Sequence, residues 1–125
     1  MSVFSNIDPK KILFKGQHFF LIYDNYPVSQ GHILIISYRE KQDFFQLSFE
    51  EKQELPLLIE GAKTIIEENL NPEGYNIGMN CGEAAGQTVM HFHCHVIPRF
   101  KGDMKNPAGG IRHCIEGKGY YKSID

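Results

Sequence analysis

Several features that define other classes of protein are scarce in this chain. Only three cysteines occur among its 125 residues, and none stands in a C-x-x-C pair, so neither a disulfide framework nor a zinc ribbon is predicted. Apolar runs such as Ile33–Ile36 reach only about five residues, far short of a membrane span. Residues 1–20 mix lysine and aspartate into the apolar positions, which excludes a signal-peptide core. These absences predict a soluble, cytoplasmic protein with no membrane partner.

The chain also lacks a strong charge of one sign. It carries 13 basic and 15 acidic residues, for a net charge of −2, and its longest basic run is Lys10–Lys11. An extended nucleic-acid surface is therefore not expected. Hydrophobic residues make up 42% of the sequence and charged residues 22%, which excludes intrinsic disorder. The length favours one domain, covering residues 1–125, with a core of its own.

The first half of the chain predicts three short strands and one long helix. The strands are residues 11–15, 18–23 and 31–37, and the last of these is apolar on both faces. Ser48-x-x-Glu51 has the spacing of a capping box, and apolar side chains follow at steps of three and four residues. Pro56 should kink this helix or mark a short preceding turn, and Asn71-Pro72 should end it.

The second half predicts two more strands, residues 75–80 and 89–100, joined by a loop with two glycines. A glycine-rich tail with little periodicity starts at Lys101. The predicted fold class is therefore α+β, an antiparallel sheet covered by one long helix.

Three histidines fall within five positions of the last predicted strand. His91, His93 and His95 alternate with apolar residues, so on a strand all three imidazoles would point to one face. Each imidazole in an ordinary core would need a buried polar partner. The histidine face is therefore predicted to be a functional surface.

Three interpretations of this face compete. It could be a solvated sheet face, or it could bind zinc or copper through neutral imidazoles. For metal, the nearest further ligands are Glu83 and Cys94, and Cys94 points to the opposite face. The third interpretation is a phosphate site with a nucleophilic imidazole, because Gly86-Gln87-Thr88 supplies backbone, amide and hydroxyl donors. The residues alone favour phosphate only slightly over metal.

The segment Asn80–Arg99 resembles the signature of the histidine triad (HIT) family of nucleotide hydrolases and transferases. In that family, His-φ-His-φ-His-φ-φ follows a Gly-Gln-Ser/Thr turn, as here. Asp24-x-x-Pro27 and Gly31–Ile36 are similar to the family's other landmark, which carries an aspartate and a fourth histidine. The resemblance covers most of the chain.

The resemblance implies a catalytic role for four histidines. His93 would attack the α-phosphorus and form a nucleotidyl-histidine intermediate that water then hydrolyses. His95 and His91 would flank the phosphate, and His32 would face the same site from a neighbouring strand. Substrate-binding positions are also implied: Asp24 at the ribose hydroxyls, Asn25 at the rim, and Asn80, Gly86, Gln87 and Thr88 around the phosphate and leaving group.

The resemblance further implies a homodimer of paired sheets and chemistry that needs neither metal nor cofactor. The residues Val3–Asn6 stand where many members carry a C-x-x-C zinc pair, so no structural zinc is expected. The expected activity is hydrolysis at the α-phosphate of a purine nucleotide derivative, either a diadenosine polyphosphate or a nucleoside phosphoramidate. The alternatives are a nucleotide-binding sensor with vestigial hydrolysis and, third, a metal-dependent enzyme.

Overall fold

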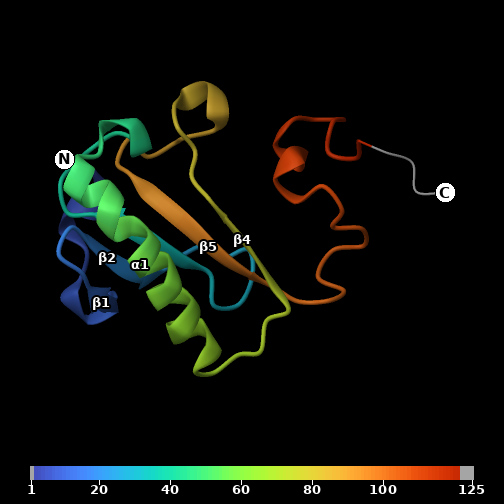
Figure 1. Ribbon diagram of the computed structural model, residues 1–125, viewed down its shortest axis with the longest axis horizontal. Coiled ribbons are helices and arrows are strands. Elements are labelled where there is room, and N and C mark those ends of the chain that lie inside the picture. The colour runs from blue at the N-terminus through green and yellow to red at the C-terminus, as the bar shows by residue number, and fades with distance from the viewer. Residues whose placement is uncertain (1, 122–125) are drawn as a thin grey trace.

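The computed structural model describes residues 2–121, which form one five-stranded sheet with a single long helix packed on it (Figure 1). Every strand pair is antiparallel, and the order across the sheet is β1-β2-β3-β5-β4. The elements are β1 (Ile12–Lys15), β2 (Phe19–Tyr23), β3 (Ile33–Ser37), α1 (Phe49–Glu67), β4 (Gly74–Gly78) and β5 (His93–Arg99). The α+β prediction is confirmed.

Helix α1 begins at the predicted capping box. The Ser48 hydroxyl accepts the backbone N–H of Glu51 at 3.1 Å, and the Glu51 carboxylate accepts the N–H of Ser48 at 2.7 Å. The helix then continues through Pro56, which lies exposed in its interior, so no separate turn precedes this proline. Pro56 has no N–H to donate to the preceding helical turn.

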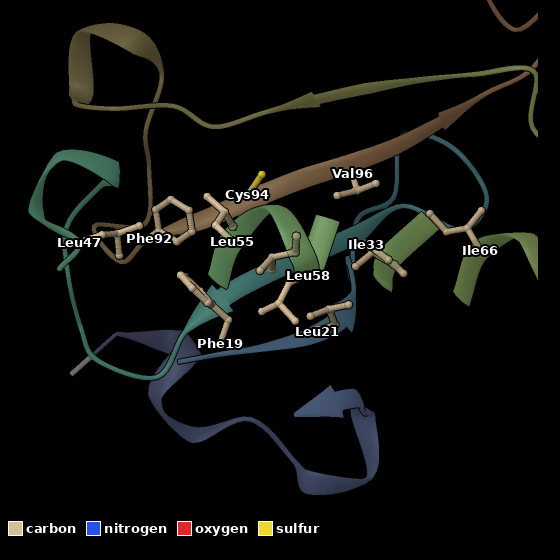
Figure 2. Packing of buried hydrophobic residues seen from close by; sticks show 12 residues of the cluster. Phe19, Leu21, Ile33, Leu47, Leu55, Leu58, Ile66, Phe92, Cys94 and Val96 are labelled. Carbon is tan, nitrogen blue, oxygen red and sulfur yellow. The ribbon is translucent and has the colours of Figure 1, made fainter. Parts of the chain in front are cut away.

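The main core lies between α1 and one face of the sheet (Figure 2). Alternate residues of β2, β3 and β5 point into it and meet the apolar stripe of the helix. Its sheet residues include Phe19, Leu21, Ile33, Ile35, Cys94 and Val96. Burial raises the pKa of the Cys94 thiol to about 12, so this cysteine packs as a small apolar residue.

The other face of the sheet carries the histidines and a smaller apolar cluster. Phe20, Ile22, Leu34 and Ile36 are buried there beneath the N-terminal residues Phe4, Ile7 and Ile12. Leu34 pairs with His95 across β3 and β5, and Ile36 pairs with His93. The histidine strand β5 therefore lies one strand in from the β4 edge, on a face that is apolar toward β1.

Strand β5 is shorter than the sequence indicates, because it begins at His93 rather than Val89. His93 and His95 point to the open face and Cys94 to the core, as period-two alternation predicts. His91 precedes the strand, but its ring lies on the same side of the sheet as the other two, because the Phe4 ring packs edge-on against both His91 and His93. Unlike His93 and His95, the His91 ring is fully buried.

The tail after β5 folds back on itself beyond β4 (Figure 1). A helical turn in this tail, Gly110–Cys114, starts from Gly109 at φ 96°, a backbone conformation that favours glycine. The His113 ring packs on Tyr120 and lies against the backbone of Gly119, where any Cβ would overlap the ring. Within residues 2–121, no helix is both long and apolar enough to cross a membrane.

Candidate functional site

A cavity of about 520 Å³ opens on the histidine face. Its floor is His93 and His95 of β5 with Ile22 and Leu34 of the neighbouring strands. Its walls come from three separate segments: Val3, Phe4 and Ile7; Asp24, Asn25 and Tyr26; and Asn80, Gly86, Thr88 and Val89. The cavity thus brings together most of the site residues that the sequence predicts, from segments far apart in the chain.

His93 is oriented by a main-chain carbonyl. Its Nδ1 lies 2.8 Å from the carbonyl oxygen of His91, which can only accept, so Nδ1 carries the proton and donates it. In the neutral ring, Nε2 is then the nitrogen with the free lone pair. The Phe4 ring packs edge-on against His93 at 5.1 Å between centroids and limits its rotation.

His32 and His95 form a connected pair. The backbone N–H of Val28 donates to His32 Nδ1 at 3.2 Å, which places the proton of a neutral His32 on Nε2. That Nε2 lies 2.9 Å from His95 Nδ1 and 3.5 Å from an Asp24 carboxylate oxygen. His95 Nδ1 therefore accepts, and its own proton is held on Nε2.

Burial keeps both rings of this pair neutral. The pKa of His32 is lowered, chiefly because burial disfavours the charged ring, although the Asp24 carboxylate opposes this. Burial, with the neighbouring His32 and His93 rings, lowers the pKa of His95 to about 4. The 3.5 Å contact between His32 and Asp24 therefore joins a carboxylate to an imidazole that is neutral near pH 7, and it is not an ion pair.

His91 does not line the cavity. Its Nε2 donates to the carbonyl oxygen of Ser37 at 2.7 Å, and its Nδ1 accepts from the Ser2 hydroxyl at 2.5 Å. The ring thus joins the end of β3 to the N-terminal segment that forms one cavity wall. The family resemblance implies a place for His91 beside a phosphate, whereas in this structure its ring contacts the segments that form the site and not the cavity itself.

The loop before the histidines is held by Gln87, whose side chain is buried. Its amide oxygen accepts the N–H of Gly82 at 2.8 Å, and its amide nitrogen donates to the carbonyls of Gln42 and Val89. Gln87 therefore presents no free side-chain donor to the cavity. The cavity is lined instead by its neighbours Gly86 and Thr88 and by Asn80, all of them exposed.

Asp24 lies where β2 ends. One of its carboxylate oxygens accepts the N–H of Tyr26 at 2.8 Å, and the other faces His32. The backbone N–H of Asp24 donates to the carbonyl of His32 across the turn, so the two residues are fixed relative to each other. Asn25 follows at the exposed rim.

The N-terminal wall is the part of the site that the sequence patterns did not predict. Ser2 is tied at its backbone N–H to the Glu40 carboxylate at 2.7 Å and at its hydroxyl to His91. This places the side chains of Val3, Phe4 and Ile7 over the cavity. The only sequence signal is their apolar character in an otherwise polar stretch.

Three ligand atoms at the site could chelate a metal ion. One atom each from Asp24, His32 and His95 lies within 4.8 Å of the others, and a carboxylate with two imidazoles is a donor set that suits zinc. The same imidazole nitrogens hydrogen-bond to each other. A metal would therefore have to displace the proton that links His32 to His95.

A larger cavity, of about 670 Å³, lies at the far end of β5 against the tail. Among the cationic residues that line it, Arg99 is paired with Asp103 at 2.7 Å and also donates to Asn76. No histidine or cysteine lines it. By volume alone this cavity would be the candidate functional site, but the histidines line the smaller cavity.

The comparison with known sequences agrees with this geometry. The HIT domain family matches residues 6–102. The chain is 34% identical over 100 residues to a bis(5'-adenosyl)-triphosphatase of Dictyostelium discoideum, covering 80% of this chain and 67% of that protein. It is 31% identical over 93 residues to an AP-4-A phosphorylase of Mycobacterium tuberculosis, covering 74% of this chain but only about half (48%) of that protein.

Solved structures show the same fold. A HIT family member from Bacillus subtilis aligns with a TM-score of 0.74 at 23% identity, over 99% of this chain and 81% of that one. The diadenosine triphosphate hydrolase of Plasmodium falciparum aligns with a TM-score of 0.74 at 30% identity, over 80% of this chain and 68% of that one. With a family match over residues 6–102 and the histidine cavity in place, this chain belongs to the HIT domain family.

Proposed function

We propose that this chain hydrolyses a purine nucleotide derivative at its α-phosphate through a covalent intermediate on His93. The observation that carries the proposal is the hydrogen bond from His93 Nδ1 to the carbonyl of His91, which leaves the Nε2 lone pair on a ring that lines the cavity. An oriented neutral imidazole is a competent nucleophile toward phosphorus. Two relatives, a bis(5'-adenosyl)-triphosphatase and an AP-4-A phosphorylase, support an adenosine nucleotide as substrate.

In the first step, His93 Nε2 forms a bond to the α-phosphorus while the bond to the leaving atom breaks. The leaving nitrogen or oxygen takes a proton from His95 Nε2. Binding of the phosphate anion is accompanied by the uptake of one proton at His95 Nδ1, in place of the hydrogen bond from His32, because an adjacent negative charge raises an imidazole pKa. The His95 ring is therefore neutral after it has given up its Nε2 proton. The His93 ring gains positive charge in the adduct, and its hydrogen bond to the carbonyl of His91 becomes stronger.

In the second step, water attacks the phosphorus of the adduct. The water proton passes to His95, the bond between His93 Nε2 and phosphorus breaks, and a nucleoside monophosphate is released. Both histidines return to their starting states, so atoms and charge balance over the cycle. Two in-line displacements at one phosphorus account for the chemistry.

The cavity walls supply the remaining recognition. Phe4, Ile7 and Leu34 form an apolar surface on which a purine ring can stack. The Asp24 carboxylate accepts from the ribose hydroxyls, with Asn25 at the rim, while backbone and side-chain donors of Gly86, Thr88 and Asn80 meet the phosphate. The proposal assigns no step to a metal ion, places the protein in the cytoplasm and includes a homodimer paired through its sheets.

The test is to trap the intermediate. Wild type is mixed with an adenylylated substrate, quenched rapidly without acid and measured by intact-protein mass spectrometry beside His93→Ala. We expect wild type to gain the mass of one adenylyl group and His93→Ala to gain none. His18→Ala is the matched control, because it removes a histidine that does not line the cavity, and it should form the adduct normally.

Binding of AMP, measured by calorimetry, separates the outcomes. Retained binding by His93→Ala without an adduct supports the role of His93 as nucleophile. An adduct on His93→Ala overturns it. If wild type binds AMP tightly but forms no adduct and releases no product, the chain is a nucleotide-binding module rather than a hydrolase.

A further inference from the structure

A cluster of hydrogen-bonded polar groups adjoins the N-terminal wall of the catalytic cavity. Its members are Ser2 and Ser5 of the N-terminal segment, Glu40 after β3, and the buried ring of His91. None of these four residues lines the cavity itself. We call this cluster the polar clamp, because it joins three segments that are far apart in the sequence.

One end of the polar clamp is the Glu40 carboxylate. Its Oε1 accepts the backbone N–H of Ser2 at 2.7 Å and the hydroxyl of Ser5 at 3.1 Å. These donors, the Ser2 amide foremost, hold the pKa of Glu40 below its usual range, so this acceptor is ionised at neutral pH. The helical turn Val3–Asn6 is thereby attached to the segment after β3 through two charge-assisted hydrogen bonds.

The Ser2 hydroxyl connects this anchor to His91. It accepts the N–H of Phe4 at 3.0 Å and donates to His91 Nδ1 at 2.5 Å. The other nitrogen of the same ring donates to the carbonyl of Ser37 at 2.7 Å. Because the ring is buried and both of its nitrogens have partners, His91 cannot turn or shift without breaking a hydrogen bond.

The polar clamp reaches the proposed nucleophile by two routes. The main chain of His91 supplies the carbonyl that accepts from His93 Nδ1, so the position of His91 sets the tautomer and the direction of the His93 ring. The second route is the Phe4 ring, which packs edge-on at 5.7 Å from His91 and 5.1 Å from His93 between ring centroids. A displacement of about 1 Å in a positioned group can lower a rate about a hundredfold, even when the change is remote from the substrate.

Apolar packing alone gives the N-terminal wall no defined orientation. Phe4 and Ile7 pack on the apolar cluster of β2 and β3, and such contacts are non-directional. Hydrogen bonds, by contrast, prefer a narrow range of distance and angle. Within the described chain, the hydrogen bonds that join residues 2–6 to the rest of the fold come from Ser2 and Ser5.

We infer that Ser2 and Glu40 are positioning residues that aim the His93 ring at the α-phosphorus. They act through His91 and Phe4, and they take no part in bond making or proton transfer. Their effect is to raise the fraction of protein in which His93 is the Nδ1–H tautomer with Nε2 directed into the cavity. The kinetic part of this inference rests on the proposed function.

Ser2→Ala tests the connection to His91. It removes the hydroxyl but leaves the backbone N–H on Glu40, so the N-terminal wall stays attached while the His91 ring loses one partner. We expect the rate of adduct formation to fall about tenfold, the factor that matches the loss of one hydrogen bond. Binding of AMP, measured by calorimetry, should stay near that of wild type.

Glu40→Ala tests the anchor of the wall. It removes the acceptor of both N-terminal donors, so we expect a similar fall in the rate of adduct formation and, in addition, a Kd for AMP raised about tenfold as the apolar wall loosens. Glu40→Gln keeps an amide oxygen that can accept from both donors and should restore most of the rate. Glu60→Ala removes an exposed glutamate of α1 and should behave as wild type.

A measurement without substrate reports on the geometry directly. NMR spectra of the ring nitrogens distinguish the two neutral tautomers of each histidine. In wild type we expect His93 to be held as the Nδ1–H tautomer, and in Ser2→Ala and Glu40→Ala we expect a mixture of both. Urea unfolding of each variant shows whether the change is confined to the site or extends through the fold.

The outcomes distinguish the two proposals. If wild type forms no adduct, the proposed function fails, and a tautomer mixture in Ser2→Ala still supports the positioning of His93. If wild type forms the adduct and Ser2→Ala forms it equally fast with an unchanged His93 tautomer, the proposed function stands and the inference is wrong. The inference is also wrong if both alanine variants lose activity only as their urea midpoint falls, with the His93 tautomer unchanged.

Discussion

Main-chain groups decide the proton positions on the histidines of the cavity. The N–H of Val28 fixes which nitrogen of His32 carries the proton, and the carbonyl of His91 does the same for His93. The position of the proton on His95 follows from that on His32. The same arrangement has an energetic cost at acid pH. His95 is neutral in the folded protein down to a pKa of about 4, whereas an unfolded histidine takes up a proton near 6.5.

A first prediction therefore concerns pH and stability. Between pH 6.5 and 4 the unfolded chain binds a proton that folded His95 does not, so the free energy of unfolding falls as the pH is lowered through this window. We expect about 1–2 kcal/mol from His95, after discounting for the partly solvated ring. Urea unfolding at several pH values checks this, with His95→Gln as comparison. An equal acid-induced loss in that variant would contradict the assignment.

Gln87 gives a second residue-level prediction. Its side chain satisfies three backbone groups of the cavity wall and of the segment before α1. Gln87→Ala leaves those groups without partners, so we expect a loss of about 1–3 kcal/mol in stability together with reduced turnover. Gln87→Glu can still accept from Gly82 and should lose less. If Gln87→Ala lowers turnover with its urea midpoint unchanged, Gln87 acts on the phosphate directly, as the family resemblance implies.

At the scale of the elements, α1 contains an unfavourable residue that the fold tolerates. Pro56 lies exposed in the helix interior, where the carbonyl one turn earlier loses its N–H partner. We predict that Pro56→Ala raises the free energy of unfolding by about 1–3 kcal/mol, because it restores that hydrogen bond and places a good helix former at this position. Leu57→Ala, at the exposed neighbouring position, should change stability little. Calorimetric unfolding measures both, and a less stable Pro56→Ala would contradict the argument.

The elements also show what local pattern could and could not predict. The capping box, the apolar stripe and the period-two alternation of His93 and His95 depend on neighbouring residues, and all were predictable. The position of His91 depends on Ser37 and Ser2, which lie 54 and 89 residues away in the sequence. No local periodicity in the sequence encodes such contacts, so the predicted strand extends too far toward Val89.

For the whole molecule, the site is assembled from both ends of the sequence. The N-terminal residues Val3 and Phe4 line the catalytic cavity, and Ile111 of the tail lines a smaller hollow that also reaches His95. Neither segment has a regular periodicity that would have linked it to the histidines. The family resemblance identified the histidines and Asp24, whereas the apolar walls required the three-dimensional arrangement.

The sheet has two edges, and they make the proposed homodimer testable. Among residues 2–121, strand β4 pairs only with β5 and exposes Ile77 at 45%, while β1 pairs only with β2 and exposes Phe14 at 50%. An unpaired strand edge presents backbone donors and acceptors to a second chain. Strand β4 is the edge nearer the histidines, separated from β3 only by β5. We therefore expect the two copies to join their sheets through β4.

Ile77→Lys should then shift the protein toward monomer in sedimentation velocity, because a like charge from each copy would enter the contact. Phe14→Lys places the same charge on the other edge and should leave the oligomeric state as it is. Dissociation by Phe14→Lys alone would move the interface to β1. A wild type that sediments as a monomer at all concentrations would remove the dimer from the proposal and leave the cavity of a single chain to act by itself.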